Sequence, residues 1–216
     1  MHKFITGVGF AGHMHSGKDT ATNYLKNSIC KRMGEDYIVT TLALAQPIKQ
    51  FCIDYLGMTE HQVYDQDGKA EYNDFWGMTN REILQKIGTD AMRNGFHPDV
   101  WVKIAQLKIK KAIDTGSFWI VTDVRFPNEA DMIRDNGGIV VWVENFRAIP
   151  NPLTVDSKNP KTISEHISEQ RLAPVKIDYI LDNNNGLIEL QDKIEKLKYF
   201  IIDNNYYAHY DAQYKG

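Results

Sequence analysis

A glycine-rich stretch near the start of the chain, GFAGHMHSGKDT over residues 9–20, contains residue types that could grip phosphate. Gly12, Gly17 and Lys18 match the spacing of the phosphate-binding loop G-x-x-x-x-G-K-[ST]. In such a loop the glycines let backbone N–H groups converge on phosphate oxygens, and the lysine adds a mobile positive charge. The next position, which normally supplies a hydroxyl to magnesium, is Asp19. The spacing predicts phosphate binding, and the carboxylate departs from the usual motif.

Three roles are open for Asp19. A carboxylate beside a triphosphate is electrostatically unfavourable unless a divalent cation or a cationic side chain lies between them. Asp19 could therefore approach Mg²⁺, directly or through water, or it could face a second substrate and a neighbouring base. It could also do no more than complement the positive end of the following helix. Thr20, one position late for the motif, could supply a hydroxyl or cap that helix.

The sequence on either side of the loop has the context that the motif requires. An apolar stretch over residues 4–10 predicts a short strand, and the apolar periodicity after the loop predicts a helix from Lys18 to Met33. This context favours a phosphate loop over an ordinary glycine-rich turn with a solvated lysine. A dinucleotide-binding turn is also disfavoured, because it would leave Lys18 unexplained.

A second polar segment, TDVRFPNEAD, follows the apolar stretch SFWIVT at residues 117–122. Open α/β sheets place their ligands at the carboxyl ends of the strands, where this segment would begin. Asp123 could hold a metal, directly or through water, and Arg125 could clamp a phosphate with two hydrogen bonds. An Asp–Arg pair that only fixes the loop is the alternative, and it is the weaker one once a phosphate loop lies on the same edge.

The residues Thr79-Asn80-Arg81-Glu82 have the pattern of a capping box, which predicts a helix from there to about Arg93. The stretch ILQKIGTDAMRNGFHPDVWV, which overlaps this helix, carries a polar helical face. Gln85, Thr89 and Arg93 recur at every fourth position, which places them near one side of a helix. A polar face is usually only a solvated face, but this one is close in sequence to Trp101, whose ring could stack on a base. Lys49, in AQPIKQF, is a further candidate for phosphate binding.

The elements that must position these residues alternate along the chain, strand with helix. Predicted strands lie near residues 4–10, 37–43, 117–122, 139–143 and 177–181. This alternation predicts an α/β fold with a mostly parallel five-stranded sheet covered by helices on both faces. We expect a single domain over residues 1–216, with a core of 1–45, 115–143 and 175–203 and an insertion at about 46–114.

The segment from about 144 to 174 is polar and contains prolines, and we predict that it forms a lid with a short helix around Ile163–Arg171. Cations on a closing lid can neutralise a transferring phosphoryl group and exclude water. The candidates are Arg147, Lys158, Lys161, His166 and Arg171. Many lid charges are bystanders, and His166 fits a hydrogen-bonding role better than the role of a catalytic base.

The composition narrows the classes of function. With 216 residues, 43% hydrophobic and 25% charged, the chain has the make-up of a soluble globular protein. The net charge of −3 argues against general nucleic-acid binding, and no apolar run reaches the length of a membrane span. Cys30 and Cys52 lack metal-type spacing and are expected to be buried thiols. We therefore expect a cytoplasmic protein that binds neither nucleic acid nor membrane.

Six motifs follow one another along the chain: GHMHSGKDT, LALAQPIKQF, LQKIGTDAMRNGFHPDVWV, VTDVRFPNEAD, a lid containing SEH, and DYILDNNNGLIEL. Together they resemble the bacteriophage deoxynucleoside monophosphate kinases over nearly the whole chain. The resemblance implies an adenylate-kinase-like P-loop NTPase, a three-layer α/β/α fold with monophosphate-binding helices and a lid. It implies transfer of the γ-phosphate of ATP to a deoxynucleoside monophosphate with Mg²⁺, and an aspartate in place of the hydroxyl as a mark of the family.

The same resemblance implies roles for individual residues. The loop would hold the ATP phosphates through Gly12, His15, Ser16, Gly17, Lys18, Asp19 and Thr20. The monophosphate would be faced by Lys49, Gln85, Arg93 and Trp101, with Thr89 on the same helical face. Asp123 and Arg125 would lie between the substrates, with Asp19 and Asp123 as the metal candidates. Asn183 and Asn184 fall where such folds pass the adenine.

The resemblance also bears on the cellular setting and on the alternatives. It implies a homodimer that supplies precursors for phage DNA synthesis, in the host cytoplasm if a phage encodes the chain. One alternative function is a P-loop kinase with a different acceptor: dephospho-coenzyme A, phosphomevalonate or another phosphorylated metabolite. The other alternative is a nucleotide-binding adaptor without catalysis. The missing N-K-x-D motif counts against a GTPase switch. The sequence does not identify the accepted bases.

Overall fold

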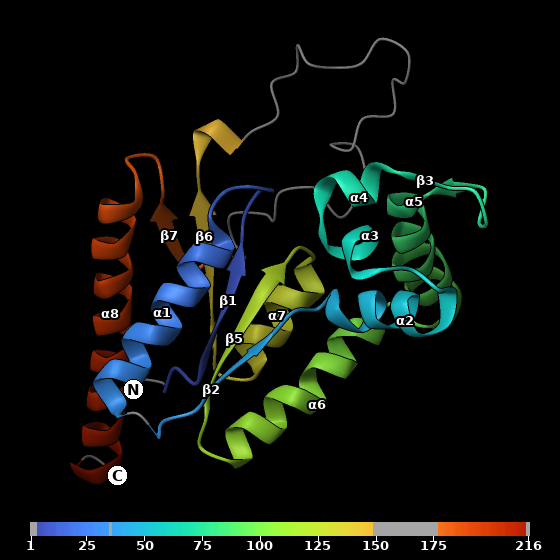
Figure 1. Ribbon diagram of the computed structural model, residues 1–216. Helices are drawn as coiled ribbons and strands as arrows, with labels where there is room; N and C mark the ends of the chain where they lie inside the picture. Colours follow the sequence, from blue (N-terminus) through green and yellow to red (C-terminus); the bar gives the residue numbers. More distant parts are fainter. Residues whose placement is uncertain (1–3, 35, 149–176, 215–216) are drawn as a thin grey trace. The chain divides into compact units, whose positions relative to one another are not determined.

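The computed structural model describes residues 4–34, 36–148 and 177–214 (Figure 1). The chain divides into two compact units. The first consists of Met1–Leu42 with Lys108–Gly216, and the second of Ala43–Leu107. The predicted monophosphate-binding insertion, at about 46–114, overlaps the second unit.

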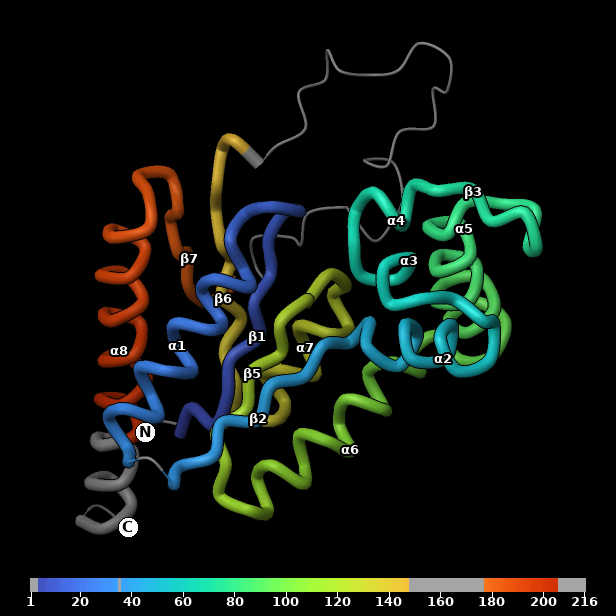
Figure 2. The backbone as a smooth tube through the Cα atoms, viewed as in Figure 1, coloured from blue at the N-terminus to red at the C-terminus, as the bar shows by residue number. Residues whose placement is uncertain are grey.

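The first unit is built on a five-stranded sheet. Its strands are β1 (Gly7–Ala11), β2 (Val39–Leu42), β5 (Phe118–Val124), β6 (Ile139–Glu144) and β7 (Tyr179–Asp182). Their order in the sheet is β2-β5-β1-β6-β7, and every pair of neighbours is parallel. β1 therefore lies at the centre, between β5 and β6, as the ribbon and the tube both show (Figures 1 and 2). The predicted parallel five-stranded sheet is confirmed.

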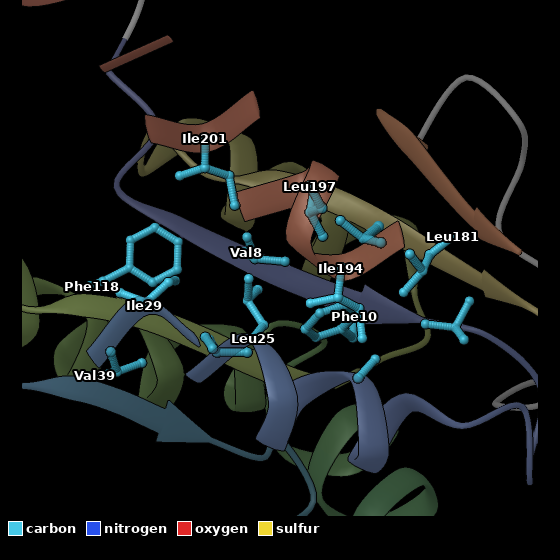
Figure 3. Packing of buried hydrophobic residues seen from close by; sticks show 14 of the residues in the cluster. Val8, Phe10, Leu25, Ile29, Val39, Phe118, Leu181, Ile194, Leu197 and Ile201 are labelled. Carbon is cyan, nitrogen blue, oxygen red and sulfur yellow. The ribbon is translucent and has the colours of Figure 1, made fainter. Parts of the chain in front are cut away.

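Two helices, α1 (Lys18–Met33) and α8 (Leu187–Tyr214), cover one face of this sheet. Figure 3 shows how Leu25 of α1 and Ile194 of α8 converge on Phe10 of β1, in a cluster whose members are buried. Burial of these aliphatic and aromatic groups is the main stabilising term of such a core. The α1 boundaries agree with the predicted ones.

A third helix, α7 (Pro127–Asp135), covers the opposite face and contacts β1 and β6. Successive residues of a strand face opposite sides of the sheet, so Gly9 points away from α1 and α8. A Cβ added at Gly9 would lie 2.7 Å from Cδ1 of Ile133 on α7. Met132 and Ile133 are both buried there. The first unit is thus a three-layer α/β/α structure with the carboxyl ends of its parallel strands on one edge.

The second unit is mainly helical. It contains α2 (Gln46–Leu56), α3 (Glu60–Tyr64), α4 (Gln66–Ala70), the hairpin of β3 (Tyr72–Asn73) and β4 (Met78–Thr79), and α5 (Asn80–Gln85). Its core is the buried cluster of Cys52, Met58, Val63 and Ile83. Burial raises the pKa of the Cys52 thiol to about 11, so this cysteine is a packing residue. Cys30, in the first unit, is half-buried.

The helix predicted to run from Thr79 to about Arg93 changes type part of the way along. Its start is confirmed: Thr79 Oγ1 accepts a hydrogen bond from the N–H of Glu82, and Glu82 accepts one from the N–H of Thr79. After α5, however, residues Lys86–Phe96 form a π-helix, η1. π-Helices are rare and are frequently found at functional sites.

The remaining elements complete the described chain. α6 (Val100–Asp114) passes from the second unit into the first, and a short 3₁₀ helix, η2 (Phe146–Ala148), follows β6. α8 continues to Tyr214, through the segment rich in Tyr and Asn that begins at Asn204. None of the helices in the described part of the chain is long and apolar enough to cross a membrane. The helix predicted near residues 163–171 lies outside the described residues.

Candidate active site

The glycine-rich loop connects β1 to α1, as its motif requires. The Lys18 ammonium donates hydrogen bonds to the carbonyl oxygens of Gly12 (2.9 Å) and His13 (2.7 Å). These two bonds fold the lysine back over its own loop. The first turn of α1 then begins with a hydrogen bond from the N–H of Ala21 to the carbonyl of Gly17 (2.9 Å). Lys18 and the positive end of α1 therefore act on the same loop.

Both motif glycines occupy positions that a side chain would not tolerate. Gly12 has a φ of +149° and Gly17 a φ of +99°. A Cβ at Gly12 would lie 2.6 Å from the carbonyl oxygen of Val143, and one at Gly17 would lie 2.4 Å from Nδ2 of Asn183. His15 is also left-handed, with a φ of +61°, an uncommon conformation outside glycine. The loop thus has the backbone conformation of a tight anion-binding turn.

The side chains of the loop divide into buried and exposed groups. Ser16 is fully buried, and its Oγ has no hydrogen-bond partner among the described residues. A buried hydroxyl without a partner is costly, so Ser16 Oγ is suited to meeting a ligand oxygen. His15, Asp19 and Thr20 are exposed, with the last two in the first turn of α1.

The carboxyl end of β5 brings a second set of residues to this edge of the sheet. β5 pairs with β1, with Val124 opposite Ala11, so Asp123 lies at the end of the strand adjacent to the phosphate loop. Asp123 is half-buried and Arg125 exposed. The structure thus brings Asp123 and Arg125 to the same edge of the first unit as the loop.

A residue that sequence reasoning missed, Glu129, fixes this turn. It is buried, with 2% of its surface exposed. One of its carboxylate oxygens accepts hydrogen bonds from the N–H groups of Arg125 (2.7 Å) and Phe126 (3.0 Å). The signal was present in the sequence, because Glu129 stands three positions after Phe126, the spacing of a capping box.

We expect Glu129→Ala to destabilise the first unit by about 1–3 kcal/mol, because two backbone donors lose their acceptor. Thermal or denaturant unfolding measures the change. Asp135→Ala, at an exposed position at the end of the same helix, is the matched control and should leave stability nearly unchanged. Equal stability of the two variants would contradict the role given to Glu129.

The turn between β7 and α8 contributes asparagines beside the loop. Asn183 Nδ2 donates to the carbonyl oxygen of Ser16 (2.8 Å), and Asn184 Oδ1 accepts from the N–H of Phe146 (2.8 Å). Asp182 pairs with Lys193 of α8 (2.8 Å), and this bond, with those from Asn184, lowers the pKa of the Asp182 carboxyl. Both predicted adenine-loop residues therefore have their side chains bound to the protein.

The residues that are candidates for binding the acceptor lie in the second unit. Lys49 is on α2, with its Nζ 4.3 Å from the centroid of the Tyr64 ring. α2 packs against the π-helix at Gly88, where an added Cβ would lie 2.8 Å from Cδ1 of Ile48. Thr89 and Arg93, both half-buried, are on that π-helix, and Gln85 ends the helix before it.

Trp101 has a different environment from the one predicted. It is buried, with 5% of its surface exposed, and its indole N–H donates to the carbonyl oxygen of Gly88 (2.8 Å). The ring therefore supports the π-helix from within the second unit. Its predicted role in stacking on a base stays a prediction.

The lid is mostly outside the described residues, including His166, Arg171, Lys158 and Lys161. Arg147 is described: it is exposed in η2, and its N–H donates to Oδ1 of Asn145 (3.0 Å).

The donor chemistry of the first unit is compatible with Mg²⁺. This ion takes oxygen ligands, usually one or two carboxylates together with phosphate oxygens and water. Asp19 follows β1 and Asp123 ends β5, and the two strands are neighbours in the sheet. In the second unit, His61 lies near Asp65 and Asp67. Hydrogen bonds to Asp65 and Glu71 raise the pKa of His61, which favours an ion pair over a metal-binding imidazole.

A phosphate loop after the central strand of a parallel α/β sheet, with Asp123 at the end of the adjacent strand and Arg125 just after it, is the arrangement of a P-loop nucleotide-binding site. The profile of the deoxynucleotide monophosphate kinases matches residues 66–194, more than half of the chain. The chain belongs to the deoxynucleotide monophosphate kinase family. It is therefore an enzyme of the kinase class, with ATP as co-substrate and small molecules as substrates.

Individual relatives agree with this membership. A protein of Acanthamoeba polyphaga mimivirus, proposed to be a deoxynucleotide monophosphate kinase, is 29% identical over 199 residues, 87% of this chain and 93% of its own length. The deoxynucleotide monophosphate kinase of Escherichia phage RB69 is 29% identical over 126 residues, 58% of this chain and 46% of that protein. The chain thus spans about half the length of this phage relative.

At lower identity, the chain is also similar to other kinases. The dephospho-CoA kinase of Fusobacterium nucleatum is 24% identical over 196 residues, covering 88% of this chain and 95% of that protein. Among solved structures, the dephospho-CoA kinase from Campylobacter jejuni has a TM-score of 0.44 at 15% identity, covering 91% of this chain and 97% of that one.

Proposed function

We propose that this protein phosphorylates deoxynucleoside monophosphates to diphosphates with the γ-phosphate of ATP, and so supplies precursors for DNA synthesis. The single observation that carries the proposal is the phosphate loop, with Lys18 held over it, in a chain of the deoxynucleotide monophosphate kinase family. The match extends from the second unit into the first.

On the ATP side, the loop from Gly12 to Thr20 would surround the triphosphate with backbone N–H groups. Lys18 would leave the carbonyls of Gly12 and His13 for the β- and γ-phosphate oxygens, a better partner for an ammonium than neutral carbonyls. Ser16 Oγ and the backbone of His15 would complete the cradle. The turn at Asn183 and Asn184 would pass beside the adenine.

Asp19 and Asp123 are the residues that would hold Mg²⁺, directly or through water. Such an ion neutralises charge that develops on the β- and γ-phosphate oxygens. Its presence would also reconcile Asp19 with a triphosphate, since a carboxylate and a phosphate otherwise repel each other. Arg125, and Arg147, His166 or Arg171 of the lid, would add positive charge around the transferring group.

On the acceptor side, Lys49 and Arg93 would hold the phosphate of the deoxynucleoside monophosphate that accepts the γ-phosphate. Gln85, Thr89 and Trp101 are the candidates for contacts to sugar and base. The acceptor phosphate is already an anion near neutral pH, so no strong general base is needed. Positioning and electrostatic stabilisation would account for most of the rate enhancement.

A second candidate acceptor is dephospho-coenzyme A, favoured by the similarity to the dephospho-CoA kinase of Fusobacterium nucleatum over most of the chain. Coupled ADP release separates the two. The panel contains dGMP, dTMP, dCMP, dAMP, their ribose counterparts, dephospho-coenzyme A and phosphomevalonate. We expect turnover with one or more deoxynucleotides. ADP release with dephospho-coenzyme A alone would replace the proposed acceptor, and ATP binding without any acceptor-dependent ADP would favour an adaptor.

We expect Arg93→Ala to raise the KM for the deoxynucleoside monophosphate by about 10–100-fold, as for the loss of a charge-assisted bond to phosphate. The KM for ATP should stay the same, and steady-state kinetics with each substrate varied in turn measures both. Arg81→Ala is the matched control in the same unit, because the Arg81 guanidinium donates to Gln66. A change confined to the KM for ATP would remove Arg93 from the acceptor site.

We also propose a homodimer, which the exposed aromatic residues of the second unit and the family resemblance support. Phe75 and Trp76 are exposed on the β3–β4 hairpin, with their rings 5.2 Å apart. Sedimentation or light scattering of the full chain would measure the oligomeric state.

A further inference from the structure

We infer that Asn183 is a positioning residue for the phosphate loop, and that it acts through the loop backbone rather than by contacting the adenine. The inference rests on the proposed function only in taking the glycine-rich loop as the site of the ATP phosphates. In place of the adenine contact expected at this position, Asn183 fixes the backbone of the phosphate loop within the first unit.

Asn183 reaches the phosphate loop through its side-chain amide. Asn183 Nδ2 lies 2.8 Å from the carbonyl oxygen of Ser16, in the middle of the loop and 167 positions away in sequence. A carbonyl oxygen can only accept, so the amide must present its NH₂ group there and its orientation is determined. Because the Ser16 carbonyl is held on the Asn183 side, the peptide that joins Ser16 to Gly17 must direct its N–H to the other side.

Gly17 leaves the space that this hydrogen bond requires. A Cβ at Gly17 would lie 2.4 Å from Asn183 Nδ2, far inside van der Waals contact. The second glycine of the motif therefore does two things: it adopts a φ of +99°, and it leaves room for the asparagine amide to reach the loop. The residue pair Gly17 and Asn183 forms one packed unit.

Backbone and side-chain hydrogen bonds hold the turn that carries Asn183 in place. The N–H of Asn183 donates to the carbonyl of Glu144 at the end of β6 (2.7 Å). On one side Asp182 is paired with Lys193 of α8, and on the other Asn184 accepts from the N–H of Phe146. With these neighbours fixed, the amide of Asn183 has little freedom to turn toward another partner. It holds the phosphate loop to the β6 and β7 side of the sheet.

Inorganic tripolyphosphate separates this role from an adenine contact, because it occupies a phosphate site and has no base. Calorimetry should show that Asn183→Ala lowers the affinities for tripolyphosphate and for ATP by the same factor, about tenfold for one lost hydrogen bond to the loop. The KM for the acceptor should not change. Asn136→Ala is the matched control: Asn136 Nδ2 donates to the carbonyl of Met132, also at 2.8 Å, but at the end of α7.

Several results would overturn the inference. If Asn183→Ala lowers the affinity for ATP and leaves the affinity for tripolyphosphate unchanged, Asn183 contacts the adenine. If neither ligand is affected, or if Asn136→Ala has an equal effect, the bond to Ser16 has no specific role. Asn183→Ser, whose side chain is too short to reach Ser16, replaces the alanine variant if that one does not fold. Wild-type protein that binds both ligands but transfers no phosphate would reject the proposed function while leaving this test intact.

Discussion

Lys18→Ala is expected to lower kcat by about a thousandfold or more, the size of effect seen when a main electrostatic contact to a transferring group is removed. The Lys18 ammonium lies over the loop, with Nζ bound to the carbonyls of Gly12 and His13. Removing the ammonium leaves the loop backbone in place, because Gly12, Gly17 and the first turn of α1 determine its conformation. ATP-dependent turnover at saturating substrate measures the effect.

The control for this variant is Lys26→Ala, a half-buried lysine further along the same helix. We expect it to keep nearly the full kcat, because it lies outside the loop. Circular dichroism of both variants should show the wild-type fold. A kcat near the wild-type value for a folded Lys18→Ala protein would contradict the mechanism, since Lys18 is the only lysine or arginine between Gly9 and Thr20.

Asp123→Asn is the second large effect that we expect, a fall in kcat of about 10²–10³-fold at low Mg²⁺. The amide keeps the shape of the side chain but loses the negative charge that would hold the cation. The concentration of Mg²⁺ needed for half-maximal activity should rise, and excess Mg²⁺ should restore part of the rate. Titrating the rate with Mg²⁺ measures this directly.

The matched control is Asp114→Asn, at an exposed position at the end of α6, which should leave the Mg²⁺ dependence unchanged. The comparison with Asp19→Asn decides between the two metal candidates. If Asp19→Asn shifts the Mg²⁺ dependence and Asp123→Asn does not, the cation is held on the loop side. A reduced rate in Asp123→Asn with an unchanged Mg²⁺ dependence would show that Asp123 has another role.

The phosphate loop and the sheet could be predicted from the sequence because their signals are local. β-Branched runs, the glycine spacing and the helix after Lys18 all lie within a few residues of the features that they predict. The same holds for the Thr79 capping box, whose donor and acceptor are three positions apart. Parallel order followed from the alternation of strands and helices, since parallel neighbours need a crossover connection.

The rest depends on contacts between distant residues. The indole N–H of Trp101 donates to the carbonyl of Gly88, 13 positions away, and the Ile48 side chain of α2 packs against Gly88. Because these contacts come from outside residues 79–93, the periodicity of that segment could not reveal the π-helix. Asn183 is similar: its partner Ser16 is at the other end of the chain. Glu129 is the exception, because its capping-box spacing was visible and only the apolar Phe126 at the cap position concealed it.

The measurement that tests the central claim most directly is transfer of labelled phosphate. The protein would be incubated with γ-³²P-ATP, Mg²⁺ and one deoxynucleoside monophosphate at a time, and the products separated by chromatography. The account predicts labelled deoxynucleoside diphosphate, in amounts equal to the ADP formed, and none with Lys18→Ala. Label that appears only as inorganic phosphate, or only in a different acceptor such as dephospho-coenzyme A, would contradict it.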